Sequence, residues 1–165
     1  MEHRIATIED LPGIVGIYNS TIESRIVTAD LEEVTVEDRI QWFVQHDPTK
    51  RPLWVFEKES HGNEMLGWLS FQSFYGRVAY DGTVEVSIYL APAARGVGLG
   101  KEILQFAIDI APKYDVDTLL GFVFSHNITS VKLFEQKGFE QWGLLPDIAK
   151  MDSGTRSLLI LGRKV

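Results

Sequence analysis

A short loop with three glycines is the first part of this sequence with a specific chemical capability. The segment Arg95-Gly96-Val97-Gly98-Leu99-Gly100-Lys101 follows a strand-like run, Val84 to Leu90, and leads directly into an amphipathic helix pattern. Glycine accepts positive φ and has no Cβ, so such a loop can turn its backbone N–H groups inward. The helix that follows adds free N–H groups and the positive end of its dipole. The sequence therefore predicts an anion site, and a diphosphate is its natural guest.

Two well-known phosphate-binding loops do not fit this segment. A Walker A loop requires glycine where Arg95 stands and Ser or Thr where Glu102 stands. A dinucleotide-binding fingerprint requires Gly or Ala at Lys101 if it begins at Gly96, or at Ile103 if it begins two residues later. Both are excluded. The remaining choices are another kind of phosphate loop or a glycine-rich strand-to-helix turn with no ligand.

The loop resembles motif A of the GNAT N-acetyltransferases, which reads Arg/Gln-x-x-Gly-x-Gly/Ala. Arg95, Gly98 and Gly100 occupy the fixed positions, and the loop follows a strand and opens a helix, as in that family. In the family, motif A wraps the pyrophosphate of acetyl-CoA. The resemblance therefore implies acetyl-CoA as co-substrate, without a metal. The loop residues implied to bind it are Arg95, Gly96, Val97, Gly98, Leu99, Gly100 and Lys101.

The residues of the strand before the loop resemble one particular branch of this family. Thr83-Val84-Glu85 and Ser87-Ile88-Tyr89-Leu90, with Ile17-Tyr18-Asn19 near the start, look like the phosphinothricin and methionine sulfoximine acetyltransferase branch. In that branch a glutamate at the position of Glu85 is the general base, which implies the same role here. A base is needed because primary amines are mostly protonated at neutral pH. The alternative is that Glu85 is an ordinary solvent-facing residue of the strand, although glutamate is disfavoured in strands.

The resemblance also assigns the remaining cofactor contacts. Backbone groups of Ile88, Tyr89 and Leu90 would pair with the pantetheine arm as an added strand does, and an N–H in this stretch would stabilise the oxyanion. Asn127, at the start of a later helix, would contact CoA, and the same residue also reads as a helix N-cap. Many family members carry a Tyr as general acid where this chain has Phe134. The general acid is therefore unassigned.

Contacts with the amine acceptor are placed by the same branch before and at the start of the central strand. The corresponding residues are Tyr75, Gly76, Arg77, Glu85, Val86 and Ser87. Tyr75 stands where relatives have an Arg. Arg77 lies close enough in sequence to replace it as a carboxylate clamp, with a plain surface Arg as the alternative. The expected acceptor is a small amino acid or analogue; the alternatives are a peptide or protein N-terminus, or a non-catalytic acetyl-CoA-binding module.

Length, charge and composition set limits on the rest. With 165 residues, the chain is expected to form one domain, residues 1–165. A net charge of −7 and the lack of a Lys/Arg cluster speak against nucleic-acid binding. The absence of cysteine excludes disulfides and thiolate metal sites. No apolar run approaches the roughly 20 residues of a membrane span, and the N-terminus lacks a signal-peptide core. We therefore expect a cytoplasmic protein, and the family resemblance implies a homodimer.

The elements that must position these residues follow from the sequence pattern. Four helices are expected: one with Leu11 to Tyr18 on its face, one with Ile40 to Val44, one from the glycine loop to about Ala111, ended by Pro112, and one at Ile128–Lys137. Strands are expected at Arg4–Ile8, Leu53–Lys58, Met65–Gln72, Val84–Leu90, Thr118–Phe124, Phe139–Leu144 and Ser157–Arg163.

Two connections complete this description. Ser60–Asn63 is expected to be the turn of a hairpin, and Asp147–Arg156 the link between the last two strands. The resulting order, β-α-α-β-β-β-α-β-α-β-β, is that of the GNAT fold. This is an α/β (α+β) arrangement, a mixed twisted sheet of about seven strands with about four helices.

Overall fold

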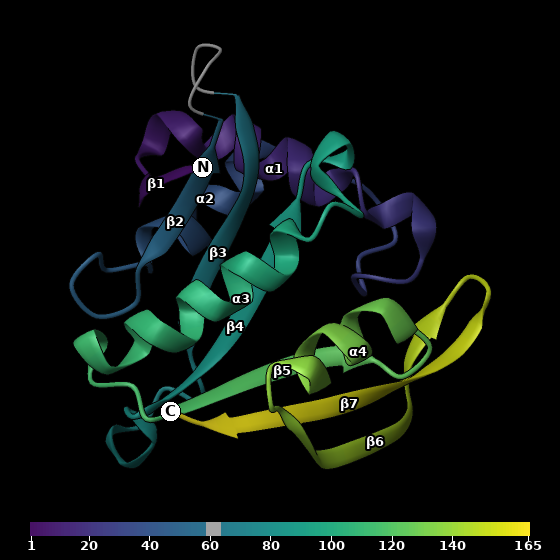
Figure 1. Cartoon of the computed structure of the whole chain (residues 1–165). Helices are drawn as coiled ribbons and strands as arrows, with labels where there is room; N and C mark the ends of the chain where they lie inside the picture. Colours follow the sequence, from purple (N-terminus) through teal and green to yellow (C-terminus); the bar gives the residue numbers. More distant parts are fainter. Residues whose placement is uncertain (59–63) are drawn as a thin grey trace.

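Within residues 1–58 and 64–165, which this computed structural model describes, seven strands and four α-helices follow the predicted order (Figure 1). The hairpin turn expected at 60–63 lies outside the described residues. The helices are α1 (Leu11–Asn19), α2 (Val36–Val44), α3 (Leu99–Ile110) and α4 (Ile128–Gln136). The strands are β1 (Glu2–Ile5), β2 (Leu53–Glu57), β3 (Met65–Ser73), β4 (Thr83–Leu90), β5 (Thr118–Phe124), β6 (Glu140–Met151) and β7 (Gly154–Lys164).

All of these strands belong to one mixed sheet with the order β1-β2-β3-β4-β5-β7-β6. The pairing of β4 with β5 is parallel, and the other neighbouring strands are antiparallel. A parallel neighbour needs a crossover connection, and α3 provides it between β4 and β5. This arrangement confirms the expected GNAT fold class.

Helices cover both faces of the sheet, α1 and α2 on one and α3 and α4 on the other (Figure 1). Successive side chains of a strand point to opposite faces, and β4 follows this rule. Val84 and Val86 are buried in the core that contains the apolar stripe of α3. Ser87 and Tyr89 face α1 and α2 instead, and the Tyr89 ring lies 5.1 Å from that of Tyr18. The central strand thus presents its polar side chains to the α1–α2 face.

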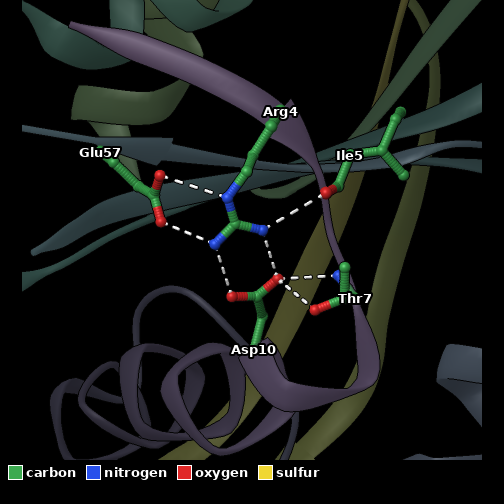
Figure 2. Close-up of polar contacts among 5 residues, drawn as sticks. All are labelled: Arg4, Ile5, Thr7, Asp10 and Glu57. Carbon is green, nitrogen blue, oxygen red and sulfur yellow. Dashed lines mark hydrogen bonds and ion pairs between the residues drawn. The ribbon is translucent and has the colours of Figure 1, made fainter. Parts of the chain in front are cut away.

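A charged cluster joins the edge of the sheet to the start of α1 (Figure 2). The Arg4 guanidinium donates to both oxygens of Asp10, at 2.7 and 2.8 Å, and to both oxygens of Glu57, at 3.3 and 2.7 Å. Asp10 also accepts from the backbone N–H of Thr7, which completes a capping box with Thr7 as the N-cap. The planar guanidinium matches two carboxylates at once, so the pairs are stronger than point-charge contacts.

Two expected features before the central strand are revised. The first strand covers Glu2–Ile5, not Arg4–Ile8, because Thr7 is the N-cap of a 3-10 turn at Ile8–Asp10. The capping box of Thr35 and Asp38 is present, but the inward face of α2 differs from the pattern. Ile40 and Val44 are exposed, and Trp42 and Phe43 pack against the sheet. The wider aromatic side chains take the partly buried positions that face the sheet.

Two prolines, Pro112 and Pro146, bear on how the second half of the chain compares with the predicted elements. The predicted end of α3 near Pro112 is confirmed, because the α-helix ends at Ile110, and a separate 3-10 helix at Ala111–Tyr114, whose first turn tolerates proline, follows it. The segment Asp147–Arg156 is not a loop, because β6 and β7 extend through it to a tight turn at Asp152. Pro146 has no N–H for the ladder, and the register shifts between Leu145 and Ala149 before pairing resumes.

Candidate active site

The site is a wedge that opens where β4 and β5 separate (Figure 1). The two strands pair only from Thr83 to Glu85 on β4, opposite Thr118 to Leu120 on β5. Beyond Glu85 the strands diverge, and a cavity of about 410 Å³, the splay cleft, fills the gap. Six segments line it: the end of β4, β5, α4, the glycine loop, the start of α3 and the segment between α1 and α2.

The edge of β4 supplies backbone groups to the splay cleft. Residues 86–90 of this strand pair with β3 on one side. Among the described residues, no strand pairs with them on the β5 side. Ile88, Tyr89 and Leu90 all line the cleft. An open strand edge binds an extended ligand in the way a sheet accepts one more strand, which is the arrangement expected for a pantetheine arm.

The glycine loop has the predicted backbone. Gly96 and Gly98 have φ of 76° and 91°, and Gly98 is the N-cap of α3, a helix of 12 residues. No atom lies within 4 Å of a Cβ added at either glycine, so their positive φ, rather than crowding, calls for glycine. Arg95, Gly96 and Gly100 line the splay cleft. The remaining predicted loop residues, Val97, Gly98, Leu99 and Lys101, do not line it, and the Leu99 side chain is buried in the core.

Arg95 ties three parts of the cleft wall together. Its Nε donates to the carbonyl oxygen of Leu90 at 3.0 Å, and a terminal nitrogen donates to Oγ of Ser20 at 2.6 Å. The first bond holds the end of β4, and the second holds the end of α1. The segment after α1 also belongs to this wall, where Thr21, Ser24, Ile26 and Val27 lie.

Glu85 lies at the vertex of the wedge. It is the last β4 residue paired with β5, it faces Gln72 across the β3–β4 ladder, and it lines the splay cleft. Burial raises the pKa of its carboxyl, and a hydrogen bond with Ser87 opposes that rise. A carboxylate with a raised pKa is a stronger base, closer to the neutral range where proton transfer is most effective.

Asn127 and Phe134 line the same cleft from α4. Oδ1 of Asn127 accepts from the backbone N–H of Ser130 at 3.1 Å, so the predicted N-cap is present. The Phe134 ring packs against β5 so closely that a Cβ added at Gly121 would lie 2.5 Å from it. A phenol hydroxyl is therefore missing at the position where many family members carry one.

The other predicted acceptor residues lie away from Glu85, Val86 and Ser87. Tyr75, Gly76 and Arg77 belong to the segment between β3 and β4, are exposed, and do not line the splay cleft. The Tyr75 side chain is 74% exposed and its ring lies 6.1 Å from that of Tyr80. Within one copy of the chain, the structure thus places two groups of predicted acceptor residues in different surroundings.

A smaller cavity of about 150 Å³, the Arg39 pocket, adjoins the splay cleft on the α1–α2 face of the sheet. Ser87 and Tyr89 line both cavities. In the described part of the chain, no group of three or more His, Asp or Glu side chains could hold a metal ion. No helix among those residues is long and apolar enough to cross a membrane.

Comparison with known proteins gives consistent matches over most of the chain. Residues 15–139 match the model of the acetyltransferase (GNAT) family. A Bacillus subtilis protein named "Putative phosphinothricin acetyltransferase YwnH" is 52% identical over 165 residues, covering 100% of this chain and 99% of that protein. An L-methionine sulfoximine/L-methionine sulfone acetyltransferase of Pseudomonas aeruginosa is 30% identical, covering 89% of this chain and 84% of that protein.

A solved structure has the same fold. It is a GNAT superfamily phosphinothricin acetyltransferase from Sinorhizobium meliloti in complex with acetyl-CoA. The match has a TM-score of 0.90 at 24% identity and covers 99% of this chain and 88% of that one. At this identity the match concerns the fold alone.

Proposed function

This chain belongs to the acetyltransferase (GNAT) family and is an acetyl-CoA-dependent N-acetyltransferase, and from that premise we propose that it acetylates the primary amine of a small amino acid or analogue. The observation that carries the proposal is the place of Glu85. Its carboxyl lies at the vertex of the splay cleft, on the sheet face that also forms the Arg39 pocket. A base at this point meets an amine that enters from the α1–α2 side.

Acetyl-CoA supplies the acetyl group as a thioester. We propose that the glycine loop and the N-terminus of α3 bind its pyrophosphate, and that the open edge of β4 binds the pantetheine arm. Asn127 adds a contact from α4. The domain that does this spans residues 1–165, and because acetyl-CoA is an intracellular metabolite, the cytoplasm is the proposed site of action.

Glu85 performs the proton chemistry in this proposal. Its carboxylate takes a proton from the ammonium group of the acceptor, directly or through a water, and the free amine attacks the thioester carbonyl. A β4 backbone N–H among residues 88–90 stabilises the oxyanion. The tetrahedral intermediate loses the second amine proton to water, the carbon–sulfur bond breaks, and CoA leaves as the thiolate or takes a proton from water, because Phe134 offers none. The products are the N-acetylated acceptor and CoA.

We propose an amino acid or analogue because the relatives that match most of the chain are named for such acceptors. One of them is named for L-methionine sulfoximine and L-methionine sulfone. We also propose that two copies form a dimer along β6. This edge strand exposes the large apolar side chains of Trp142, Leu144 and Ile148, a combination that soluble proteins usually cover.

An acceptor screen tests the proposed function. Purified protein is mixed with acetyl-CoA and one amine at a time, and release of the CoA thiol is measured. The panel contains amino acids, methionine sulfoximine, phosphinothricin, short peptides and polyamines. We expect the highest kcat/KM with a single amino acid or analogue. Turnover confined to peptides or polyamines would disprove the proposed acceptor class, and no turnover with any amine would favour an acetyl-CoA-binding module.

A further inference from the structure

The Arg39 pocket has a polar floor and aromatic walls. Its floor consists of Ser70 and Gln72 on β3 and Ser87 on β4, while Tyr18 and Trp42 form part of the wall. Arg39 enters from α2. A few placed polar groups among aromatic side chains are typical of small-molecule sites.

The register of the sheet places this pocket beside the proposed base. Gln72 is paired with Glu85, and Ser70 with Ser87, across the β3–β4 ladder. Paired residues of neighbouring strands project to the same face, so the pocket floor and Glu85 share one face of the sheet. Ser87 also lines both the pocket and the splay cleft. An acceptor whose amine lies at Glu85 therefore has the Arg39 pocket next to its other substituents.

The volume of the pocket limits what it can hold. A cavity of about 150 Å³ is the size that holds one benzene molecule, or about six non-hydrogen atoms. The side chain of methionine sulfone also has about six non-hydrogen atoms, so it matches this volume. The side chain of tryptophan, with about ten non-hydrogen atoms, exceeds this volume.

The charges of the pocket indicate which chemical group it binds. Arg39 is the one cation among its lining residues, and none of them is a carboxylate. The guanidinium is held in place by Asp30, at 3.1 Å, and by the Tyr18 ring, at 4.6 Å. The guanidinium of Arg39 carries five N–H donors. Within the described part of the chain, it makes one hydrogen bond, to Asp30. Because Asp30 balances the positive charge of Arg39, the pocket suits a neutral group with hydrogen-bond acceptors better than it suits an anion.

We infer that the Arg39 pocket receives the side chain of the amino-acid acceptor, and that Arg39 selects side chains that end in a hydrogen-bond-accepting oxygen group. This inference rests on the proposed function and makes it narrower. Sulfone, sulfoximine and amide groups fit this description, whereas the ammonium of lysine or of a polyamine does not.

Methionine and methionine sulfone provide the test, because they differ only by two oxygen atoms on sulfur. The kcat/KM of both is measured for the parent, Arg39→Gln and Arg39→Lys. We expect the parent to prefer the sulfone and Arg39→Gln to reduce this preference about 10- to 100-fold, the usual effect of losing a hydrogen bond to a charged group. The change should lie in KM rather than kcat. Arg39→Lys should retain part of the preference, and the KM for acetyl-CoA should stay within about twofold.

Arg25→Gln is the matched control. The Arg25 side chain is 26% exposed, like that of Arg39, and it pairs with an exposed aspartate, Asp152, at 2.9 Å. The control removes the same charge and a similar ion pair but does not touch the Arg39 pocket. The ratio of sulfone to methionine should equal that of the parent.

The outcomes separate this inference from the proposed function. An unchanged ratio in Arg39→Gln, with both acceptors affected equally, overturns the inference and leaves the proposed function standing. If the parent acetylates neither amino acid, binding of methionine sulfone is measured by calorimetry in the presence of CoA. Binding that is lost in Arg39→Gln would support the pocket even though the proposed acceptor class is wrong. Absence of binding to the parent would overturn both.

Discussion

Glu85→Gln separates a catalytic from a structural role for the residue at the vertex of the splay cleft. The substitution keeps the shape and polarity of the side chain, including a partner for Ser87, and removes the base. General-base catalysis contributes about 10²–10⁴-fold, so kcat/KM should fall by about that factor at pH 7. The loss should shrink as the pH approaches the pKa of the amine, because the free amine then forms without help.

The pKa of Glu85 adds a second expectation, for stability. Burial raises this pKa, so the folded protein binds the proton more tightly than the unfolded chain does. Between the ordinary and the raised pKa, the free energy of unfolding therefore falls as the pH rises. Glu85→Gln removes the ionisable group and therefore removes this fall in the free energy of unfolding. The variant should be at least as stable as the parent at pH 7, and any gain should vanish below about pH 4, under the ordinary glutamate pKa.

The assay combines a pH–rate profile with thermal unfolding of parent and variant. The parent should lose activity as the pH falls through the raised pKa of Glu85, and the variant should lack this acidic limb. The affinity for acetyl-CoA, measured by calorimetry, should be similar in both, because its proposed contacts lie further along the chain. Parallel pH profiles, or an inactive variant that is also less stable at pH 7, would refute the assignment of Glu85 as base.

Three further changes test other parts of the structure. Gly98→Val should weaken acetyl-CoA binding, measured by calorimetry, more than about tenfold, or ~1.4 kcal/mol. Gly154 also has positive φ, and Gly154→Val is the control that should leave the affinity unchanged. Equal affinities of the two variants for acetyl-CoA would refute a role of the glycine loop. Asp10→Asn should lower the free energy of unfolding at pH 7 by about 1–2 kcal/mol, because the Arg4 side chain is 40% exposed and solvent weakens the pair. The Arg4 hydrogen bond lowers the pKa of Asp10, so its contribution is complete above the ordinary pKa and is lost as the pH falls through the lowered one. A difference that does not shrink in denaturant titrations as the pH is lowered below the ordinary pKa of aspartate would contradict this. Leu144→Lys should shift the protein toward monomer in light scattering, and an unchanged mass would argue against a dimer along β6.

Local signals in the sequence were sufficient where a few neighbouring residues decide the structure. The capping boxes at Thr7 and Thr35 each involve residues three positions apart, and both are present. The positive φ at Gly96 and Gly98 follows equally from local chemistry. The order of strands and helices was predicted for the same reason, since periodicity reports which face of each element is buried.

Features set by distant partners were not predictable in this way. Trp42 and Arg39 contribute to a pocket because α2 packs beside α1 and against Trp68 on β3, and nothing in the helix pattern specifies these neighbours. The long β6–β7 hairpin forms despite Pro146 because pairing on both sides of the shifted register holds it. The exposed position of Tyr75 likewise depends on how the segment after β3 folds back. The resemblance placed this residue near the acceptor, but sequence alone could not specify its surroundings.

The short contact between β4 and β5 divides the backbone ladder of the sheet into two halves, which share one hydrophobic core. In the part of the chain that the structure describes, three residue pairs join the β1–β4 half to the β5–β7–β6 half. A ligand that lies along the open edge of β4 would act as the missing strand between them. Amide hydrogen exchange at the end of β4 should then report occupancy of the cleft, and the protein would reach its full resistance to unfolding only in the presence of the substrate that it consumes.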